Sequence, residues 1–293
     1  AMLAASEDAK RLVLEGEAML TPFAAAALAG CPVGELSSRR RSNLVLALSV
    51  PGMRGRHYRF PACQFEPQVR EVILGEAGVL QGARPGTYVV DMGSIAPLTS
   101  REVGAALAEK GVRFLDAPVS GGEPKAIDGT LSVMVGGEAA DFEAVKPVLS
   151  AMAVSVVRVG EVGAGNVAKL ANQIVVALNI AAMSEALVLA AKAGVEPDLV
   201  YQAIRGGLAG STVLDAKAPL VMDRKFDPGF RIKLHAKDLN NVMNTAHELH
   251  VPLPFTAAVM EVMQAMMADG CGEDDHGSII RHFEKLAGVT VAR

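Results

Sequence analysis

The stretch "GNVAKLANQIVVALNIAAMSEALVLAAKAG" (residues 165–194) marks the point where the chain changes its pattern. It is a long run of small and apolar residues with helical character, and it carries Lys169 and Asn172 near its beginning. Burying an ammonium group costs free energy unless the group is paired, so a lysine in such a helix needs a reason to be there.

A membrane span is one alternative for so apolar a segment, because its length would allow one. Polar and charged residues interrupt the run, which favours a helix buried between domains or at a subunit interface. These residues are Lys169, Asn172, Gln173, Asn179, Ser184 and Glu185. Residues 174–191 are apolar nearly all round the helix, so we expect a homodimer or homotetramer built on this region.

Upstream of this stretch, strands and helices alternate. The segments "TYVVDM" (87–92), "VRFLDAPV" (112–119), "GTLSVMVGG" (129–137) and "SVVRVG" (155–160) read as strands. A helix is expected at residues 98–111, with Thr99 or Ser100 as N-cap and Gly111 as its stop. This alternation predicts a mostly parallel sheet with helices on its faces.

Downstream of Gly163 the pattern is helical only. The sequence therefore predicts an α/β Rossmann-like N-terminal domain (residues 1–162) and an all-α C-terminal domain (residues 163–293). The opening stretch is the long inter-domain helix that joins them.

The composition excludes several functional classes. The chain has 293 residues, a formal net charge of −4 and a pI near 5.9, so it lacks the basic surface typical of nucleic-acid or membrane binding. Its cysteines, Cys31, Cys63 and Cys271, are few and widely separated, which suits the reducing cytoplasm. The groups around "HELH" (247–250) and "DGCGEDDHG" (269–277) lack the spacing of a metal site, so no metal is expected.

Two strand ends carry polar, glycine-rich sequence, "DMGSIAP" (91–97) and "DAPVSGGEPKAIDGT" (116–130). Ligands of open parallel sheets bind beyond such ends. Gly121 and Gly122 would let backbone N–H groups approach an anion, and Ser120 adds a hydroxyl donor. A tight strand-to-strand turn is the alternative interpretation.

Lys169 and Asn172 are three residues apart, so they project from one face of their helix, for which Asn166 is a candidate N-cap. A lysine in this place could donate a proton to a carbonyl oxygen that the amide orients. A solvated lysine in the first turn is the alternative. The stretch "KDLNN", with Lys237, Asp238 and Asn241, is by itself only a charged helix face.

These residues lie in or beside four motifs whose order along the chain carries a family resemblance. "DAPVSGGEPKAIDGTLSVMVGG", "GAGNVAKLANQ", "GGLAGSTVLDAKAP" and "KDL" together resemble the β-hydroxyacid dehydrogenases, over about residues 66–293. The resemblance implies an NAD or NADP cofactor and a small hydroxy or semialdehyde acid as substrate. It implies the reduction of tartronate semialdehyde to D-glycerate, with 3-hydroxyisobutyrate as the alternative substrate.

The resemblance also implies a role for individual residues. Lys169 matches the catalytic general acid and base, and Asn172 matches the amide beside it. Ser120, Gly121 and Gly122 match the loop that binds the substrate carboxylate. Ser94 and Lys237 match contacts to the cofactor.

Residues 1–65 depart from the family. The expected apolar strand followed by G-x-G-x-x-G is absent, because the five glycines in this part, Gly16, Gly30, Gly34, Gly52 and Gly55, do not have that spacing. Nor can the acidic residue that would favour NAD over NADP be located. "SSRRRSN" (37–43) is more typical of a solvated turn than of a phosphate site.

A shifted reading frame is one explanation. Read one base later, the codons of His57 and Tyr58 can encode Ile-Ile, and those of residues 59–65 can encode Asp-Ser-Leu-Pro-Ala-Asn-Ser. That translation resembles the family's strand and loop at this place. A diverged N-terminus, in a non-catalytic relative with a defective cofactor site, is the other explanation.

Overall fold

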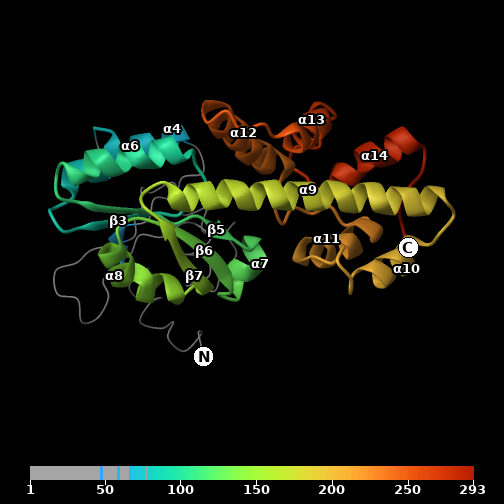
Figure 1. Cartoon of the computed structure of the whole chain (residues 1–293), viewed down its shortest axis with the longest axis horizontal. Coiled ribbons are helices and arrows are strands. Elements are labelled where there is room, and N and C mark those ends of the chain that lie inside the picture. Colours follow the sequence, from blue (N-terminus) through green and yellow to red (C-terminus); the bar gives the residue numbers. More distant parts are fainter. Residues whose placement is uncertain (1–46, 49–57, 60–65, 77) are drawn as a thin grey trace. The chain divides into compact units, whose positions relative to one another are not determined.

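The computed structural model describes residues 47–48, 58–59, 66–76 and 78–293 (Figure 1). The chain divides into two compact units, Ala1–Lys169 and Leu170–Arg293. The division falls inside one long helix, whereas the boundary expected from the sequence, at residues 162 and 163, precedes that helix. Apart from residues 47–48 and 58–59, the glycine-poor segment of residues 1–65 lies outside the described residues, including the cluster "SSRRRSN" and most of the proposed frame-shifted stretch.

The first unit contains a seven-stranded sheet with helices between its strands. Its strands are β1 (Ala47–Leu48), β2 (Tyr58–Arg59), β3 (Tyr88–Asp91), β4 (Arg113–Asp116), β5 (Val119–Ser120), β6 (Leu131–Gly136) and β7 (Ala153–Gly160). Its helices are α4 (Glu66–Leu74), α5 (Val79–Gly82), α6 (Pro97–Ala108), α7 (Gly122–Ile127) and α8 (Ala139–Ser150). The strand order is β1-β2-β3-β4-β6-β5, and β7 pairs with β6.

The sheet is mixed rather than mostly parallel, which corrects the expectation from the sequence. The pairs β2–β3, β3–β4 and β6–β7 are parallel, whereas β1–β2, β4–β6 and β5–β6 are antiparallel. A parallel connection needs a crossover of a dozen or more residues, usually with a helix that packs across the sheet. The segment between β4 and β6 is largely used by β5 and the short helix α7, so the chain returns antiparallel to β4.

Buried strands hold this unit together. All four residues of β3 are buried, as expected for a strand covered on both faces. Figure 1 shows α4 and α6 on one face of the sheet and α8 on the other. Val89, Leu115, Val135 and Leu149 belong to the core between these layers and are fully buried.

The beginning of α6 differs from the prediction. The helix begins at Pro97 with Ala96 as N-cap, and no side chain caps it. Proline is favoured at the first helical position because its fixed φ suits the helix and its missing N–H would be unpaired there anyway. Thr99 and Ser100 therefore lie inside the first turn and not at the cap. Gly111, with φ 67°, follows the helix and ends it as expected.

The long helix α9 (Ala164–Lys192) continues from the first unit into the second. The second unit also contains α10 (Pro197–Ile204), α11 (Thr212–Met222), α12 (Ile232–Glu248), α13 (Pro254–Ala268), the 3₁₀ helix η1 (His276–Ile279) and α14 (Ile280–Ala287). Leu170, Ile180 and Leu187 of α9 pack in its core with Leu239 of α12 and Met263 of α13. This unit is all-helical, as the sequence predicted.

Among the described residues, α9 is the one helix long and apolar enough to cross a membrane by length and composition. The core helix of a soluble protein passes the same test. Within the second unit, Ala177 and Ile180 are fully buried, and Ser184 donates a hydrogen bond to the Ile180 carbonyl. The helix therefore serves as the core element of its unit, while Val175 and Leu189 are exposed in the single chain.

Candidate active site

A buried aspartate at the end of β4 holds the first turn of α9. Asp116 Oδ1 accepts a hydrogen bond from the Gly163 amide at 2.7 Å, and Oδ2 accepts one from the Asn166 amide at 2.7 Å. These amides belong to the helix N-terminus, where backbone N–H groups have no partner within the helix. A carboxylate there is also favoured by the helix dipole. Asp116 thus caps α9, which is the role that the sequence predicted for Asn166. Asn166 itself lies inside the helix and is not its N-cap.

The electrostatics of Asp116 reflect its burial. The side chain is fully buried, and this burial raises the pKa of its carboxyl group above the ordinary value of 3.8. The hydrogen bonds from Gly163 and Asn166 and the charge of Arg101 oppose the rise without cancelling it.

Asn166 uses its side chain to join two other segments to the same turn. Its Oδ1 accepts the Ile95 amide at 3.1 Å, and its Nδ2 donates to Ser100 Oγ at 3.0 Å. Ser94, the predicted cofactor contact, precedes Ile95 directly and is half-buried. The loop after β3 is therefore fixed to the helix turn that leads to Lys169.

Two glycines allow this close packing. A Cβ atom on Gly165 would lie 2.5 Å from the Asp116 carbonyl oxygen and 2.6 Å from the Met134 carbonyl oxygen. A Cβ atom on Gly136, at the end of β6, would lie 2.4 Å from Asp116 Oδ1. Any larger residue at Gly165 or Gly136 would separate α9 from the strand ends. The packing therefore requires glycine at position 165 of "GAGN" and at the end of β6.

The glycine loop after β4 contains the strand-to-strand connection that was one of the two interpretations drawn from the sequence. Ser120 belongs to β5 and pairs with Ser132 of β6, so this part is a strand connection. Gly121 (φ 138°) and Gly122 (φ 67°) then take conformations that side chains rarely adopt. Both glycines are exposed, and Gly121 is the N-cap of α7. Both positions therefore favour glycine, and the binding of an anion by this loop stays a prediction.

Lys169 is buried, with 8% of its surface exposed. It lies one turn after Asn166 on α9, so the contacts of Asp116 and Asn166 fix the helix turn that presents it. This burial does not fit a solvated lysine. Asn172 follows three residues later on the same helix and is half-buried.

In the second unit a chain of polar contacts joins Asn172 to Lys237. Asn172 Nδ2 donates to Gln173 Oε1 at 2.8 Å, and Gln173 Nε2 donates to Asp238 Oδ2 at 2.6 Å. The other carboxylate oxygen, Asp238 Oδ1, lies 2.6 Å from Lys237 Nζ. Gln173 and Asp238 are buried, so the contacts are shielded from water. The "KDL" motif is therefore more than a charged face.

Sequence reasoning missed Asp116 and Gln173, which position the expected site residues. Both lie inside motifs that carry the family resemblance, and Asp116 opens "DAPVSGG". A buried carboxylate at the end of a strand was the available signal. Among the described residues, no group of three or more His, Cys, Asp or Glu side chains could hold a metal ion.

Two family models match the chain. The model for the NAD binding domain of 6-phosphogluconate dehydrogenase matches residues 62–160. The model described as NAD-binding of NADP-dependent 3-hydroxyisobutyrate dehydrogenase matches residues 163–283.

Similar proteins agree with these matches. The chain is 44% identical over 226 residues to 2-hydroxy-3-oxopropionate reductase of Escherichia coli strain K12, covering 77% of each protein. It is 37% identical to 2-(hydroxymethyl)glutarate dehydrogenase of Eubacterium barkeri, covering 76% of this chain and 75% of that protein. A solved 3-hydroxyisobutyrate dehydrogenase from Salmonella typhimurium superposes with a TM-score of 0.70 at 32% identity, covering 78% of this chain and 79% of that one.

The fold and the matched models define the class: an oxidoreductase with a Rossmann-like NAD-binding domain and a helical C-terminal domain. The chain belongs to the β-hydroxyacid dehydrogenase family, and within it the chain is close to 2-hydroxy-3-oxopropionate reductase, also called tartronate semialdehyde reductase.

The cofactor of this family, NAD or NADP, fits the chemistry of the described strand ends. β3 and β4 are parallel, so their carboxyl ends share one edge of the sheet, where dinucleotides bind. Ser94 offers a hydroxyl group after β3. The glycine fingerprint that holds the pyrophosphate in this family is absent from residues 1–65, nearly all of which lie outside the described residues.

Proposed function

We propose that the protein reduces tartronate semialdehyde (2-hydroxy-3-oxopropionate) to D-glycerate with NADH or NADPH. The 44% identity to an Escherichia coli protein of that activity is the observation that carries the proposal. The burial of Lys169 and the contacts that fix its helix turn support it, because a buried cation would stabilise the alkoxide that develops during the reduction.

In the proposed mechanism Lys169 is the general acid. The dinucleotide supplies the hydride to the aldehyde carbon when it is bound. Lys169 Nζ donates a proton to the carbonyl oxygen and stabilises the negative charge that develops there. In the reverse direction the neutral amine accepts the proton. Asn172, on the same helix face, orients that oxygen.

Ser120, Gly121 and Gly122 bind the substrate carboxylate in this proposal. The two glycines have positive φ angles and are exposed, so their N–H groups are the proposed donors, and Ser120 adds a hydroxyl group. Holding the carboxylate fixes which face of the aldehyde meets the nicotinamide. Ser94 and Lys237 contact the cofactor, and Asp238 holds the Lys237 ammonium group in place. We also propose that the protein acts in the cytoplasm.

Other substrates are the main alternative within the family. The chain is 36% identical to L-threonate dehydrogenase of Escherichia coli strain K12. It also resembles solved 3-hydroxyisobutyrate dehydrogenases at 32% and 30% identity. A 3-hydroxyisobutyrate dehydrogenase-like activity is therefore the second candidate. A non-catalytic relative is the third, because residues 1–65 lack the glycine fingerprint.

A substrate panel tests the proposal. The protein is assayed both as given and with residues 1–65 replaced by the frame-shifted translation. Dinucleotide oxidation or reduction is followed with tartronate semialdehyde, D-glycerate, 3-hydroxyisobutyrate and L-threonate, each with both dinucleotides. We expect turnover from the form with the replaced segment, with the highest kcat/KM for tartronate semialdehyde. A higher value with 3-hydroxyisobutyrate would support the second candidate, and no turnover with any acid would support the third.

A further inference from the structure

Two histidines form a buried pair beside the residues discussed above. His235 of α12 is fully buried and His276 of η1 is 5% exposed. Their Nδ1 atoms lie 2.9 Å apart, which is hydrogen-bond distance. One of these nitrogens must then donate and the other must accept, because two N–H groups or two lone pairs would repel each other.

The second nitrogen of His235 decides the direction of this bond. His235 Nε2 lies 3.3 Å from the backbone carbonyl oxygen of Gln173 on α9. A carbonyl oxygen only accepts, so Nε2 carries the hydrogen. Burial favours neutral rings over charged ones, so His235 Nδ1 keeps its lone pair. His276 therefore donates from Nδ1, and each ring is held in one tautomer.

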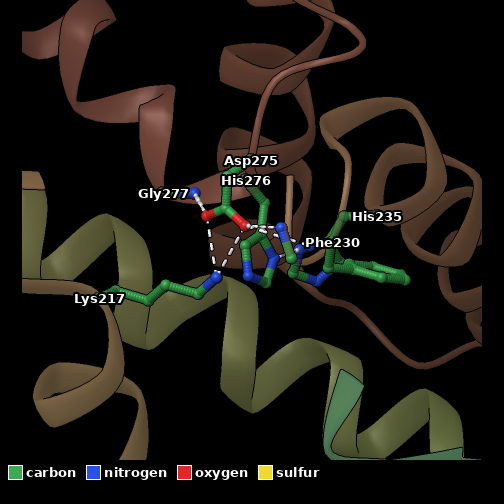
Figure 2. A network of polar contacts seen from close by, with 7 residues as sticks. Lys217, Phe230, His235, Asp275, His276 and Gly277 are labelled. Carbon is green, nitrogen blue, oxygen red and sulfur yellow. Dashed lines mark hydrogen bonds and ion pairs between the residues drawn. The ribbon is translucent and has the colours of Figure 1, made fainter. Parts of the chain in front are cut away.

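Asp275, the residue before His276, holds the beginning of η1 (Figure 2). Its carboxylate accepts the Lys217 ammonium group at 2.8 Å on each oxygen, and it accepts the amides of Gly229 (3.0 Å), Phe230 (3.1 Å) and Gly277 (2.9 Å). The His276 amide donates to the Phe230 carbonyl at 2.8 Å. These contacts tie the segment before α12 to η1.

The Phe230 ring meets both histidines edge-on, with centroid distances of 5.7 Å to His235 and 5.4 Å to His276. Figure 2 shows the two imidazoles side by side, with Phe230 next to His235. The aromatic contact limits how either ring can rotate. The His276 ring is therefore a fixed donor toward His235.

The pair sets how α12 lies on α9. Gln173 is held by α12 at two points, its carbonyl oxygen by His235 Nε2 and its side-chain amide by Asp238 Oδ2. Lys237 lies between these two α12 residues in the sequence, and Asn172 precedes Gln173. The two attachments together fix Lys237 relative to Asn172.

We propose that His235 and His276 are positioning residues, in which the Nδ1–H group of His276 holds His235 in the tautomer that attaches α12, and with it Lys237, to Gln173. This inference rests on the proposed function for the roles of Lys237 and Asn172, but the pair itself involves neither substrate nor cofactor.

Matched substitutions at His276 test the inference. His276→Asn keeps an amide N–H near the position of Nδ1, whereas His276→Leu keeps the bulk and removes the donor. His247→Leu, at an exposed position on α12, is the control for loss of a histidine. All are made in the full chain, and thermal unfolding confirms that each variant is folded.

The first measurement needs no cofactor. ¹⁵N spectra of the imidazoles should show His235 protonated on Nε2 and His276 on Nδ1 in the wild type. In His276→Leu the His235 Nδ1 loses its donor, so the ¹⁵N spectrum should show His235 in both neutral tautomers. Acetylation of Lys237, followed by mass spectrometry, should become faster in His276→Leu and stay unchanged in His276→Asn and His247→Leu.

The second measurement is turnover. His276→Leu should raise the KM for the dinucleotide and lower kcat, each by about tenfold, because a misplaced contact group costs that much or more. His276→Asn should restore both values to within about threefold of the wild type.

The outcomes separate this inference from the proposed function. An inactive wild type that shows the stated tautomers and Lys237 labelling refutes the proposed function and leaves the positioning pair in place. Equal behaviour of His276→Leu and His276→Asn in labelling, or a neutral His235 protonated on Nδ1 in the wild type, overturns the positioning pair whatever the activity.

Discussion

Removing the Asp116 carboxylate should destabilise the first unit strongly. In Asp116→Ala the amides of Gly163 and Asn166 lose their buried acceptor. Each unsatisfied buried N–H group costs about 1–3 kcal/mol. Relief from burying a charge offsets part of this loss. We therefore expect a decrease of about 2–4 kcal/mol in the free energy of unfolding.

Asp116→Asn separates the shape of this side chain from its bonding. The carboxamide has one acceptor oxygen for two donors, and its NH₂ group faces the remaining N–H. We expect a smaller decrease, of about 1–3 kcal/mol. Asp128→Ala is the matched control, because Asp128, the C-cap of α7, is exposed and its carboxylate accepts hydrogen bonds from Thr130. It should change stability by less than about 0.5 kcal/mol.

The assay is urea unfolding followed by circular dichroism, fitted as separate transitions if the two units unfold independently. In parallel, kcat of Asp116→Asn should fall by about tenfold, since Lys169 lies one turn beyond the turn that Asp116 holds. Asp116→Ala within about 0.5 kcal/mol of the wild type would refute the reasoning, because two buried orphan amides cannot be that inexpensive.

The raised pKa of the Asp116 carboxyl group also predicts that the free energy of unfolding depends on pH. Burial raises the pKa of its carboxyl group, so the folded protein binds this proton at a pH where the unfolded chain has released it. The contribution of this proton to the free energy of unfolding is fully present below the pKa of the unfolded chain, near 3.8. It is lost as the pH rises through the pKa of the folded protein. The stability of the wild type relative to Asp116→Asn should therefore increase as the pH is lowered toward 4, and the opposite slope would contradict the assignment.

Three further predictions concern the site, the assembly and the N-terminus. Lys169→Ala should lower kcat by about a hundredfold or more while dinucleotide affinity is kept, and a variant with most of the wild-type rate would remove Lys169 from the mechanism. Sedimentation should show a homodimer or homotetramer, because α9 exposes Val175 and Leu189 in the single chain, whereas a stable 30.5 kDa monomer at micromolar concentration would exclude an assembly. Calorimetric titration should show weak or no binding of NADH and NADPH to the protein as given. Binding should become tighter once residues 1–65 are replaced by the frame-shifted translation. Micromolar binding before the replacement would contradict the reading-frame hypothesis.

The sequence by itself determined the elements and the family. Buried strands such as β3 are continuous apolar runs, and helices are apolar at regular spacing, so local composition located most of both. The motifs from "DAPVSGG" to "KDL" were sufficient to identify a β-hydroxyacid dehydrogenase. Helical spacing alone placed Lys169 and Asn172 on one face.

Only the tertiary structure decided how these elements are joined. Asp116 caps a helix that begins far along the chain, and His276 meets His235 across a similar gap in sequence. Two further features differ from the sequence-based expectation. β6 runs antiparallel to β4, because the connection between these strands is used by β5 and α7. The helix α6 begins at Pro97 without a side-chain cap, although Thr99 and Ser100 were the predicted N-cap residues. A sequence pattern predicts which apolar side chains are buried, because their burial follows from their own hydrophobicity, but it left the burial of Lys169 open. Which donor meets which acceptor depends on how distant segments pack, and no local pattern contains that information.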